Sequence, residues 1–535
     1  MAELTCAAVR EILAARFHND AIKKLADLDP PSAFIDLDRA VLRITDAIKG
    51  GEPIAIAGDY DADGVIACAI LSEILTKAGA RYAVYLPDRF TDGYGINARV
   101  VDRIAENLII TVDNGIAAFE AADRAKSLGK TLIITDHHQC GFELPQAYAI
   151  VNPKRADCPS RDKNICGAAV AWYLAAGIAR AAGVEYDAKE ALALVAIATI
   201  ADCAPLVGAN RAMTRTGLRS LAISKRPFAE LLRREFPLKE GEYRDFAIDS
   251  RSITFRIVPP LNAAGRLSSA RLAYDFLTAP DFSAAATAWA RLEELCEERR
   301  TLESRVFEDA LASLDDASEN RAALVAAGVN WHEGVVGIVA ARLAEKFEKI
   351  AVVLTANGDT AKGSARGWAG YDLYEILKKC ESDLIKFGGH KGAAGLTISC
   401  EKIDDFKRKF LEICANYDCD QTEIKNAKRK MLGEIEVKEI NAALKPVFED
   451  YEPYGDGNPK PIFFARDFTI REMYRVGQGD KHIYFKFTNN LSAIYFNAPQ
   501  YDLRAKTISF HYTVSFGIFR GKIQTKLKII KIEDY

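Results

Sequence analysis

The sequence predicts an α/β protein in which a parallel-sheet domain, a long connecting helix, a second α/β domain and a C-terminal β-barrel follow one another. Three observations predict this order. Apolar runs alternate with helical patterns over 50–205, a charged amphipathic segment at 281–315 precedes a second α/β pattern at 322–400, and strand-like alternation covers 466–535. The 535 residues are enough for several domains.

The first domain is predicted from apolar runs of strand length that helices separate. Runs without alternation are typical of strands buried on both faces, and the intervening helices indicate parallel pairing. Helical patterns occur at 64–78 and 115–128. The apolar segments 168–179 and 191–201 are shorter than the roughly 18 residues of a membrane span, so we interpret them as buried helices. The expected strands are 53–58, 81–86, 108–112, 131–135 and 147–151.

A long helix is predicted over 281–315, with an apolar stripe between heavily charged positions. Such a helix either joins two lobes or lies on the surface of one lobe, and both interpretations stay open. Strands near 323–328 and 350–355 begin the second α/β domain. The stripe consists of Trp289, Leu292, Leu295, Cys296, Leu302, Val306 and Ala310.

The C-terminal 70 residues predict an antiparallel barrel or sandwich with a nucleic-acid-binding surface. Five alternating segments follow a Pro- and Gly-rich entry at 453–461. Residues 466–535 hold 12 Lys and Arg against 6 Asp and Glu, and 13 of them are Phe or Tyr. Cations that follow a backbone and rings that stack on bases suit single strands, although many of these rings must fill the barrel. Candidate contacts are Tyr474, Lys481, His482, Lys486 and Arg520.

The overall composition is that of a globular protein. Apolar residues make up 49% and charged residues 27%, which excludes a disordered or collagen-like chain. The net charge of −3 argues against a protein that coats nucleic acid through bulk charge. The 11 cysteines are scattered without a CxxC motif, and the N-terminal segment does not read as a signal peptide. We therefore expect a cytoplasmic protein without membrane contact.

Acidic and imidazole side chains gather where the predicted strands end. The carboxyl ends of parallel strands lie at one edge of a sheet, which is where ligands bind. These side chains are Asp59, Asp61 and Asp63 after the first strand, Asp113 after the third, and Asp136, His137 and His138 after the fourth, with Asp202 on a later helix.

So many carboxylates at one edge predict a divalent metal site. Like charges and burial oppose ionisation unless cations compensate them. Carboxylates with imidazole suit Mn²⁺ or Mg²⁺, and the number of ligands favours two ions, as in two-metal hydrolases.

Each residue of this group also has a structural alternative. Asp63 or Asp113 could cap a helix, and a histidine pair at a strand end is more often structural. It is the joint occurrence at the expected topological position that favours a metal. An EF-hand is excluded, because the position that needs a bidentate glutamate holds Ile70.

At these residues the chain resembles the DHH phosphoesterase superfamily, whose name is the triplet found here at 136–138. Later segments resemble the RecJ family of bacterial single-strand-specific exonucleases, and 453–461 leads into a segment similar to that family's OB-fold. The resemblance covers about residues 45–535. Its motifs, in order, are GDYDADG (58–64), DGYGIN (92–97), TVDNGI (111–116), TDHH (135–138), ADCAPL (201–206), PPLNAAGR (259–266), WHEGVVGIVAARL (331–343), GSARG (363–367) and FGGHKGAAGL (387–396).

The resemblance implies a division of roles among these residues. Asp113, His138 and Asp136 are the expected catalytic residues, with His138 facing the scissile phosphate. The metal residues are Asp59, Asp61, Asp63, Asp113, His137 and Asp202, of which Asp59 supports the other five. The expected substrate-binding residues are Arg89, Asn262, Arg266, Ser364, Arg366, Gly388, Gly389 and His390.

Two positions depart from the family pattern. Pro260 stands where the family has arginine, and Gly367 stands where it has serine. Both changes affect the expected phosphate contacts and leave the metal residues intact.

The resemblance and the patterns together divide the chain into five segments. We expect a helical extension (1–45), a DHH catalytic domain (46–280), a connecting helix (281–315), a DHH-associated substrate-binding domain (316–450) and an OB-fold domain (451–535).

The expected activity is metal-dependent 5′-to-3′ degradation of single-stranded DNA to 5′-mononucleotides, in repair and recombination. The alternatives are a related phosphoesterase acting on short oligonucleotides or cyclic dinucleotides, and a non-enzymatic scaffold on a decayed nuclease fold. The OB-like region argues against the first alternative, and the intact metal residues argue against the second. Expected partners of a monomeric protein are single-stranded DNA, a single-strand-binding protein and a helicase.

Overall fold

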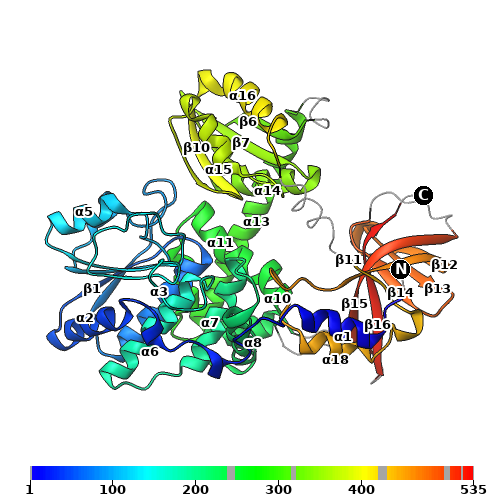
Figure 1. The fold of residues 1–535 in the computed structure, drawn as a ribbon, viewed down its shortest axis with the longest axis horizontal. Helices are drawn as coiled ribbons and strands as arrows, with labels where there is room; N and C mark the ends of the chain where they lie inside the picture. Colours follow the sequence, from blue (N-terminus) through cyan, green and yellow to red (C-terminus); the bar gives the residue numbers. More distant parts are fainter. Residues whose placement is uncertain are drawn as a thin grey trace. The chain divides into compact units, whose positions relative to one another are not determined.

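The computed structural model describes residues 3–237, 248–314, 321–419, 431–498, 506–519 and 522–533. Arg520, a candidate DNA contact, lies outside these residues. The chain forms two compact units, one of residues 1–292 and 431–535, the other of 293–430. Figure 1 shows the course of the chain through both units.

The first sheet contains five strands in the order β2-β1-β3-β4-β5, and every neighbouring pair is parallel. This confirms the parallel sheet predicted from the apolar runs. Alternate residues of each strand face different cores, with Ile54 and Ile56 in one and Ala55 and Ala57 in the other. The strands are β1 (Ile54–Ala57), β2 (Tyr82–Tyr85), β3 (Leu108–Val112), β4 (Thr131–Thr135) and β5 (Ala149–Val151).

Helices cover both faces of this sheet. α2, α3, α6 and α7 share a core with one face, and α4 and α5 share a core with the other. The helix predicted at 115–128 begins only at Phe119, because 115–118 form a turn in which Gly115 has φ 114°. The helices are α2 (Leu37–Gly50), α3 (Ala62–Lys77), α4 (Ala98–Arg103), α5 (Phe119–Ser127), α6 (Gly167–Ala182), α7 (Ala188–Ala201), α8 (Gly208–Ile223), α9 (Pro227–Glu235), α10 (Ser250–Ser252), the π-helical η3 (Ile253–Ile257), α11 (Val258–Leu267) and α12 (Arg271–Leu277).

The long helix is α13 (Phe282–Ala312), and it belongs to both units. Trp289 and Leu292 pack in the core of the first unit, and Val306 and Ala310 pack in the second. The connecting helix of the predicted fold class is therefore confirmed over the surface-helix interpretation.

The second unit has a mixed sheet in the order β6-β7-β8-β10-β9. Only β6 and β7 are parallel, and β9 is an edge strand. Its elements are β6 (Ala323–Val329), α14 (Glu333–Phe347), β7 (Ile350–Asn357), β8 (Thr360–Arg366), α15 (Leu373–Lys379), β9 (Lys386–His390), β10 (Ala393–Ser399) and α16 (Ile403–Ala415).

The C-terminal region forms a barrel, as predicted, but the expected antiparallel pairing is incomplete, because β14 pairs with β16 and β11 with β12 in parallel. Its strands run in the order β11-β12-β13-β14-β16-β15, and a further pairing of β12 with β15 closes it. Aromatic residues fill the interior, among them Phe485, Phe487 and Phe510. The elements are β11 (Met431–Glu434), α18 (Leu444–Asp450), β12 (Ile462–Val476), β13 (His482–Phe487), β14 (Ser492–Tyr495), β15 (Thr507–Phe519) and β16 (Lys522–Ile532).

The N-terminal helix α1 (Cys6–Ala15) packs with this barrel, which the sequence did not predict. Val9 and Leu13 are fully buried in the barrel core, and Leu4 pairs with Ile435 next to β11. Figure 1 shows the blue helix beside the orange and red strands. The barrel is therefore built from both ends of the chain.

Among the described residues, no helix is long and apolar enough to cross a membrane. All 11 cysteines are free thiols.

Candidate metal centre

The site lies where the order of the parallel sheet reverses. The chain leaves β1 towards β2 on one side, whereas β3 lies on the other side of β1. In this strand order the crevice at the carboxyl ends of β1 and β3 is the usual ligand site. Asp59 follows β1 and Asp113 follows β3, so both expected residues stand at this point.

The loop after β1 is held in place by the start of α3. Asp61 caps the helix, and its Oδ1 accepts hydrogen bonds from the N–H groups of Asp63 (3.0 Å) and Gly64 (3.1 Å). Gly64 is required here because a Cβ atom would lie 2.7 Å from the backbone nitrogen of Asp59. The turn therefore places all three acids of the first motif at the head of one helix.

Asp63 is fixed a second time by α6. Its carboxylate accepts hydrogen bonds from the N–H groups of Gly167 (2.7 Å) and Ala168 (2.8 Å), which are the first residues of that helix. A Cβ atom on Gly167 would lie 2.4 Å from the carboxylate of Asp113, so only glycine lets the two acids share this space. The helix cap considered for Asp63 from the sequence exists, but the helix capped is α6.

Asp113 stands in the left-handed region, with φ 62°, directly after β3. The neighbouring Asn114 is buried and joins three segments of the site. Its Nδ2 donates to the carbonyls of Ala57 (3.1 Å) and Val112 (2.8 Å), and its Oδ1 accepts from the N–H of Ile96 (3.0 Å). These bonds hold the ends of β1 and β3 and the loop of the DGYGIN motif together.

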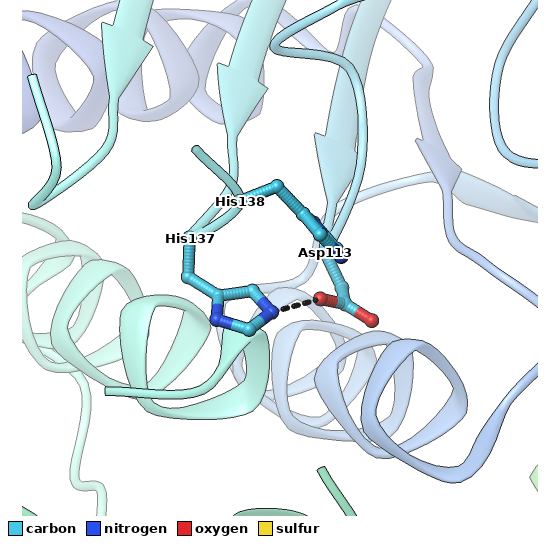
Figure 2. A group of neighbouring side chains, drawn as sticks. All are labelled: Asp113, His137 and His138. Atoms are coloured by element: carbon cyan, nitrogen blue, oxygen red, sulfur yellow. Dashed lines mark ion pairs between the residues drawn. The ribbon is translucent and has the colours of Figure 1, made fainter. Parts of the chain in front are cut away.

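His137 lies at the centre of the acids. Its Nε2 lies 3.1 Å from Oδ1 of Asp113 and 3.7 Å from Oδ2 of Asp63, and its Nδ1 lies 3.8 Å from Oδ2 of Asp202. Figure 2 shows the imidazole pointing at Asp113 from the neighbouring strand end. Two groups with metal-binding geometry share this histidine, Asp113–His137–His138 and Asp63–His137–Asp202.

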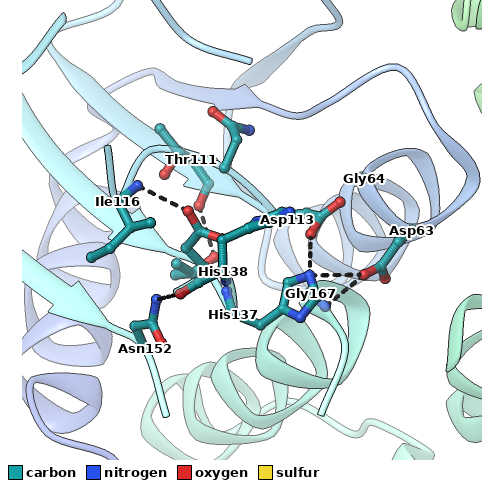
Figure 3. A network of polar contacts seen from close by, with 12 residues as sticks. Asp63, Gly64, Thr111, Asp113, Ile116, His137, His138, Asn152 and Gly167 are labelled. Atoms are coloured by element: carbon teal, nitrogen blue, oxygen red, sulfur yellow. Dashed lines mark hydrogen bonds and ion pairs between the residues drawn. The ribbon is translucent and has the colours of Figure 1, made fainter. Parts of the chain in front are cut away.

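Asp136 lies behind the histidines and is almost fully buried. Its Oδ1 accepts hydrogen bonds from the N–H of His137 (2.7 Å), the N–H of His138 (3.0 Å) and Nδ1 of His138 (2.7 Å), and its Oδ2 accepts from the N–H of Ile116 (2.9 Å). Figure 3 shows from close by the residues that donate to it, with Ile116, His137 and His138 labelled. Both carboxylate oxygens are occupied, so Asp136 orients His138 and does not offer a free metal ligand.

The imidazole of His138 is half exposed, and its Nε2 lies 3.1 Å from the hydroxyl oxygen of Tyr94. Burial alone would lower the pKa of His138, but the hydrogen bond with Asp136 raises it to about 9. Burial alone would raise the pKa of Asp136, and the bond with His138 lowers it overall. The pair is therefore a buried carboxylate that holds an imidazolium at the surface of the site.

Four acids around His137, of which Asp59, Asp63 and Asp113 are buried and Asp202 is partly exposed, have pKa values raised above the usual range, whereas that of Asp136 is lowered. Burial and then Asp61 raise the pKa of Asp59 to about 8 and of Asp63 to about 6. Burial and then Asp63 raise the pKa of Asp202 to about 8 and that of Asp113 well above its usual range. These carboxylates repel one another in a medium that favours their neutral forms.

A divalent cation fits this set of donors. Both oxygens of Asp59, Oδ1 of Asp113 and Nε2 of His137 are buried without a hydrogen-bond partner in the described part of the chain. Burial lowers the pKa of His137 to about 3, and the neutral ring is the form that binds metal. Carboxylates with one neutral imidazole are the chemistry of a Mn²⁺ or Mg²⁺ site.

Three of the expected substrate-binding residues lie on or beside α11. Asn262 accepts a hydrogen bond from the N–H of Ala62 (2.8 Å) through Oδ1. Arg89 donates from Nε to the carbonyl of Gly265 (3.2 Å), and its guanidinium lies 4.0 Å from the ring centre of Tyr60. Arg266 lies in the last turn of the same helix.

The other five lie in the second unit, where pairing of β8, β10 and β9 brings them together. Arg366 donates to Oγ of Ser364 (2.7 Å), and Gly389 has φ 151° on the edge strand. Paired residues point to the same face of a sheet. On β10, which lies between β8 and β9, the residues on this face are the small Ala393 and Gly395. The two rows are Arg366–Ala393–His390 and Ser364–Gly395–Gly388.

The two departures from the family pattern have local explanations. Pro260 is buried in the first turn of α11. A Cβ atom on Gly367 would lie 2.9 Å from the carbonyl oxygen of Lys391, while its N–H donates to the carbonyl of Gly392 (2.8 Å). Close packing against the GGHKG turn therefore favours glycine at 367.

Some residues of the site were not singled out from the sequence. Asn114, Gly167 and Tyr94 shape it as described above, and Asn152 donates to the carbonyl of His138 (3.0 Å). Tyr94 belongs to the DGYGIN motif and Asn114 to the TVDNGI motif, so the sequence could have predicted that both lie near the acids. Gly167 and Asn152 carry no such signal, because only the packing of α6 and the end of β5 brings them to the site.

Comparison with known proteins places three family models on the chain. The DHH family N-terminal domain matches residues 53–199, the DHHA1 domain matches 320–416, and the RecJ OB domain matches 433–531.

Curated relatives are similar along most of the chain. The single-stranded-DNA-specific exonuclease RecJ of Bacillus subtilis is 35% identical over 88% of this chain, which spans 59% of that relative's length. The protein of the same name from Dickeya dadantii is 30% identical over 92% of this chain and 89% of its own.

Solved structures of RecJ proteins are similar to this chain along nearly its whole length. The structure of RecJ from Thermus thermophilus in complex with Mn²⁺ is 27% identical, with a TM-score of 0.82 over 99% of this chain and 76% of that one. The Mg²⁺ complex has a TM-score of 0.77 at 26% identity, over 99% of this chain and 74% of that one.

Proposed function

The chain belongs to the RecJ family of DHH phosphoesterases, and from this premise we propose that it is a metal-dependent 5′-to-3′ exonuclease that degrades single-stranded DNA to 5′-mononucleotides in DNA repair and recombination. The observation that carries the proposal is the group of buried carboxylates around the imidazole of His137, whose Nε2 lies 3.1 Å from Asp113 and 3.7 Å from Asp63. A decayed scaffold would not retain this cluster, because without a cation it destabilises the fold.

We assign the metal to Asp63, Asp113, His137 and Asp202, which the structure groups together, and from the family resemblance also to Asp61, with Asp59 beside them. Bound Mn²⁺ or Mg²⁺ supplies Lewis acidity and lowers the pKa of water. His138 holds a proton at the surface of the site, where it can donate to a non-bridging phosphate oxygen as negative charge develops there. Asp136 keeps that imidazole charged and oriented.

The second unit supports recognition of a phosphorylated end. Arg366 and Ser364 share one face of the sheet with His390 and Gly388, which belong to strand β9 and not to a turn, so a guanidinium, a hydroxyl and an exposed glycine lie on adjacent rows. Guanidinium pairs well with phosphate, and glycine backbone allows close approach of an anion. We assign these residues to the 5′-terminal nucleotide.

The outer face of the barrel supports capture of the strand. On β12, β13 and β14 the outward residues Tyr474, Tyr484 and Ile494 form one row, and the rings of Tyr474 and Tyr484 lie 5.4 Å apart. His482 and Phe496 form a second ring pair at 5.0 Å, and Lys486 lies 5.8 Å from the centre of Tyr474. Rings and cations on one exposed face suit single strands.

Cell location and protein partners are further parts of the proposal. Eleven free thiols and the absence of a membrane-spanning helix among the described residues support a cytoplasmic protein. We also propose, from the resemblance, that the protein is monomeric and acts with a single-strand-binding protein and a helicase. The division into five segments, drawn from the resemblance and the sequence patterns, likewise stays a prediction.

The test is degradation of a 5′-phosphorylated oligonucleotide in Mn²⁺ by wild type and by Asp113→Ala. We expect 5′-mononucleotides from single-stranded DNA, much slower release from duplex or RNA, and a loss of about 10² to 10³-fold in the variant. The control is Asp157→Ala, which removes an exposed carboxylate paired with Arg155. An inactive wild type, or a fully active Asp113→Ala protein, contradicts the proposal.

A further inference from the structure

Helix α11 contacts the metal-binding loop at two points on one face. Asn262 and Gly265 are three residues apart, so they lie on the same side of the helix. Oδ1 of Asn262 accepts the N–H of Ala62 at 2.8 Å. A Cβ atom on Gly265 would lie 2.3 Å from the carbonyl oxygen of Tyr60, so the helix approaches the loop as closely as glycine permits.

Asn262 accepts the N–H of Ala62, for which the loop itself provides no hydrogen-bond acceptor. A helix begins with N–H groups that lack partners within the helix. At the start of α3, Asp61 accepts those of Asp63 and Gly64, which leaves that of Ala62. Asn262, 200 residues further along the chain, accepts it. The first turn of α3 is therefore closed by one carboxylate and one amide.

The residues on either side of this hydrogen bond are expected metal ligands. Ala62 stands between Asp61 and Asp63. A hydrogen bond that fixes the backbone of Ala62 therefore also fixes the positions from which the side chains of Asp61 and Asp63 extend. Arg89 strengthens the same contact, because it donates to the carbonyl of Gly265 and lies over the ring of Tyr60. Groups that orient metal ligands through hydrogen bonds commonly change metal affinity by 10- to 100-fold.

We propose that Asn262 is a positioning residue of the metal centre, and that its Oδ1, held against the N–H of Ala62 by α11, sets the affinity for Mn²⁺. This role replaces the contact with DNA expected from the sequence. The inference rests on the proposed metal-dependent function. It adds a residue that controls metal affinity without binding the metal itself.

Two substitutions at this position separate the two roles. Asn262→Ala removes the acceptor, whereas Asn262→Asp keeps an oxygen in its place and adds negative charge. If the oxygen positions the loop, Mn²⁺ binding weakens about 10-fold in Asn262→Ala and stays equal or tighter in Asn262→Asp. If Asn262 instead contacts a phosphate, Asn262→Ala binds DNA more weakly than wild type in EDTA while its Mn²⁺ affinity is unchanged.

The measurement is calorimetric titration of the metal-stripped full chain with MnCl₂, with single-stranded DNA binding in EDTA as the second readout. Asp187→Ala is the matched control, since it removes a helix cap of the same kind (2.8 Å to the N–H of Glu190) at the end of α7 opposite Asp202. We expect wild-type Mn²⁺ affinity in this control. Melting temperatures of all variants in EDTA report on folding.

The outcomes distinguish this inference from the proposed function. Weaker Mn²⁺ binding in Asn262→Ala, rescued in Asn262→Asp, supports the positioning role. Unchanged Mn²⁺ binding in Asn262→Ala, whether or not its DNA binding in EDTA is weaker than that of wild type, overturns it while leaving the metal-dependent function in place. A wild-type chain that binds no Mn²⁺ overturns the function itself.

Discussion

The carboxyl edge of the parallel sheet and the outer face of the barrel carry their polar groups in opposite ways. At the sheet edge, Asp59, Asp113 and Asp136 are at most 2% exposed, with strands and helices packed around them. On the barrel, Tyr474 is 43% exposed, and Lys486 forms an ion pair with Glu472 at the surface. One region buries charge, and the other exposes rings and cations.

This difference predicts how each region responds to substitution. Buried charges act on one another strongly because little water screens them, so a single change at the sheet edge has a large effect. Surface contacts on the barrel are screened and shared among neighbours, so each one contributes little. The barrel is sensitive only in its interior, which holds the apolar side chains.

Leu13→Ala tests that interior and has the largest expected effect. Leu13 is fully buried in the barrel core, and a leucine truncated in a core costs about 3 kcal/mol of stability. Hydrogen exchange of peptides from 462–532 should therefore accelerate, while peptides of the parallel sheet keep their protection. Leu42→Ala, at a leucine that is 62% exposed, is the control. Unchanged exchange in the barrel would show that α1 is not part of its core.

Asp136→Asn tests the buried charge at the sheet edge. The amide cannot hold His138 as an oriented imidazolium, so kcat should fall roughly 10- to 100-fold. The KM for DNA and the Mn²⁺ affinity should change little, because the amide oxygen of asparagine can still accept the N–H of His137 and keep that ligand in place. The surface variant Asp102→Asn, which loses an ion pair with Arg124, should keep wild-type rates. A variant impaired in Mn²⁺ binding and not in kcat would make Asp136 a metal ligand.

Tyr474→Ala tests the barrel face and has the smallest expected effect. Loss of one exposed stacking ring should weaken binding of a long single strand by about 1 kcal/mol, roughly 5-fold. Cleavage of a dinucleotide should stay unchanged, because so short a substrate needs no second surface. Fluorescence anisotropy with labelled oligonucleotides measures the first effect. Tyr148→Ala, at a tyrosine 37% exposed under Arg39, is the control. Equal losses in both variants would remove the barrel face from DNA binding.

Much of the fold was predictable because its signals are local. All five expected strands of the first sheet and all five alternating segments of the barrel occur, since strand periodicity is encoded within a few neighbouring residues. The acids could be placed at one edge from topology alone, because parallel strands end on the same side. The start of α5 was displaced by the turn that gives the N–H of Ile116 to Asp136, a contact between separate segments.

The sequence by itself determined the identity and approximate position of the metal-binding groups, because residue type and strand order suffice for both. Only the tertiary structure decided which carboxylate oxygens accept hydrogen bonds and which are left for a metal ion. The carboxylate of Asp63 accepts hydrogen bonds from the start of α6, and that of Asp136 accepts them from the histidines. The N–H of Ala62 donates to the side chain of Asn262. It also decided that α1 completes the barrel. These pairings join residues far apart in the chain, and no local pattern encodes them, because they form only when packing brings the segments within hydrogen-bonding or van der Waals distance.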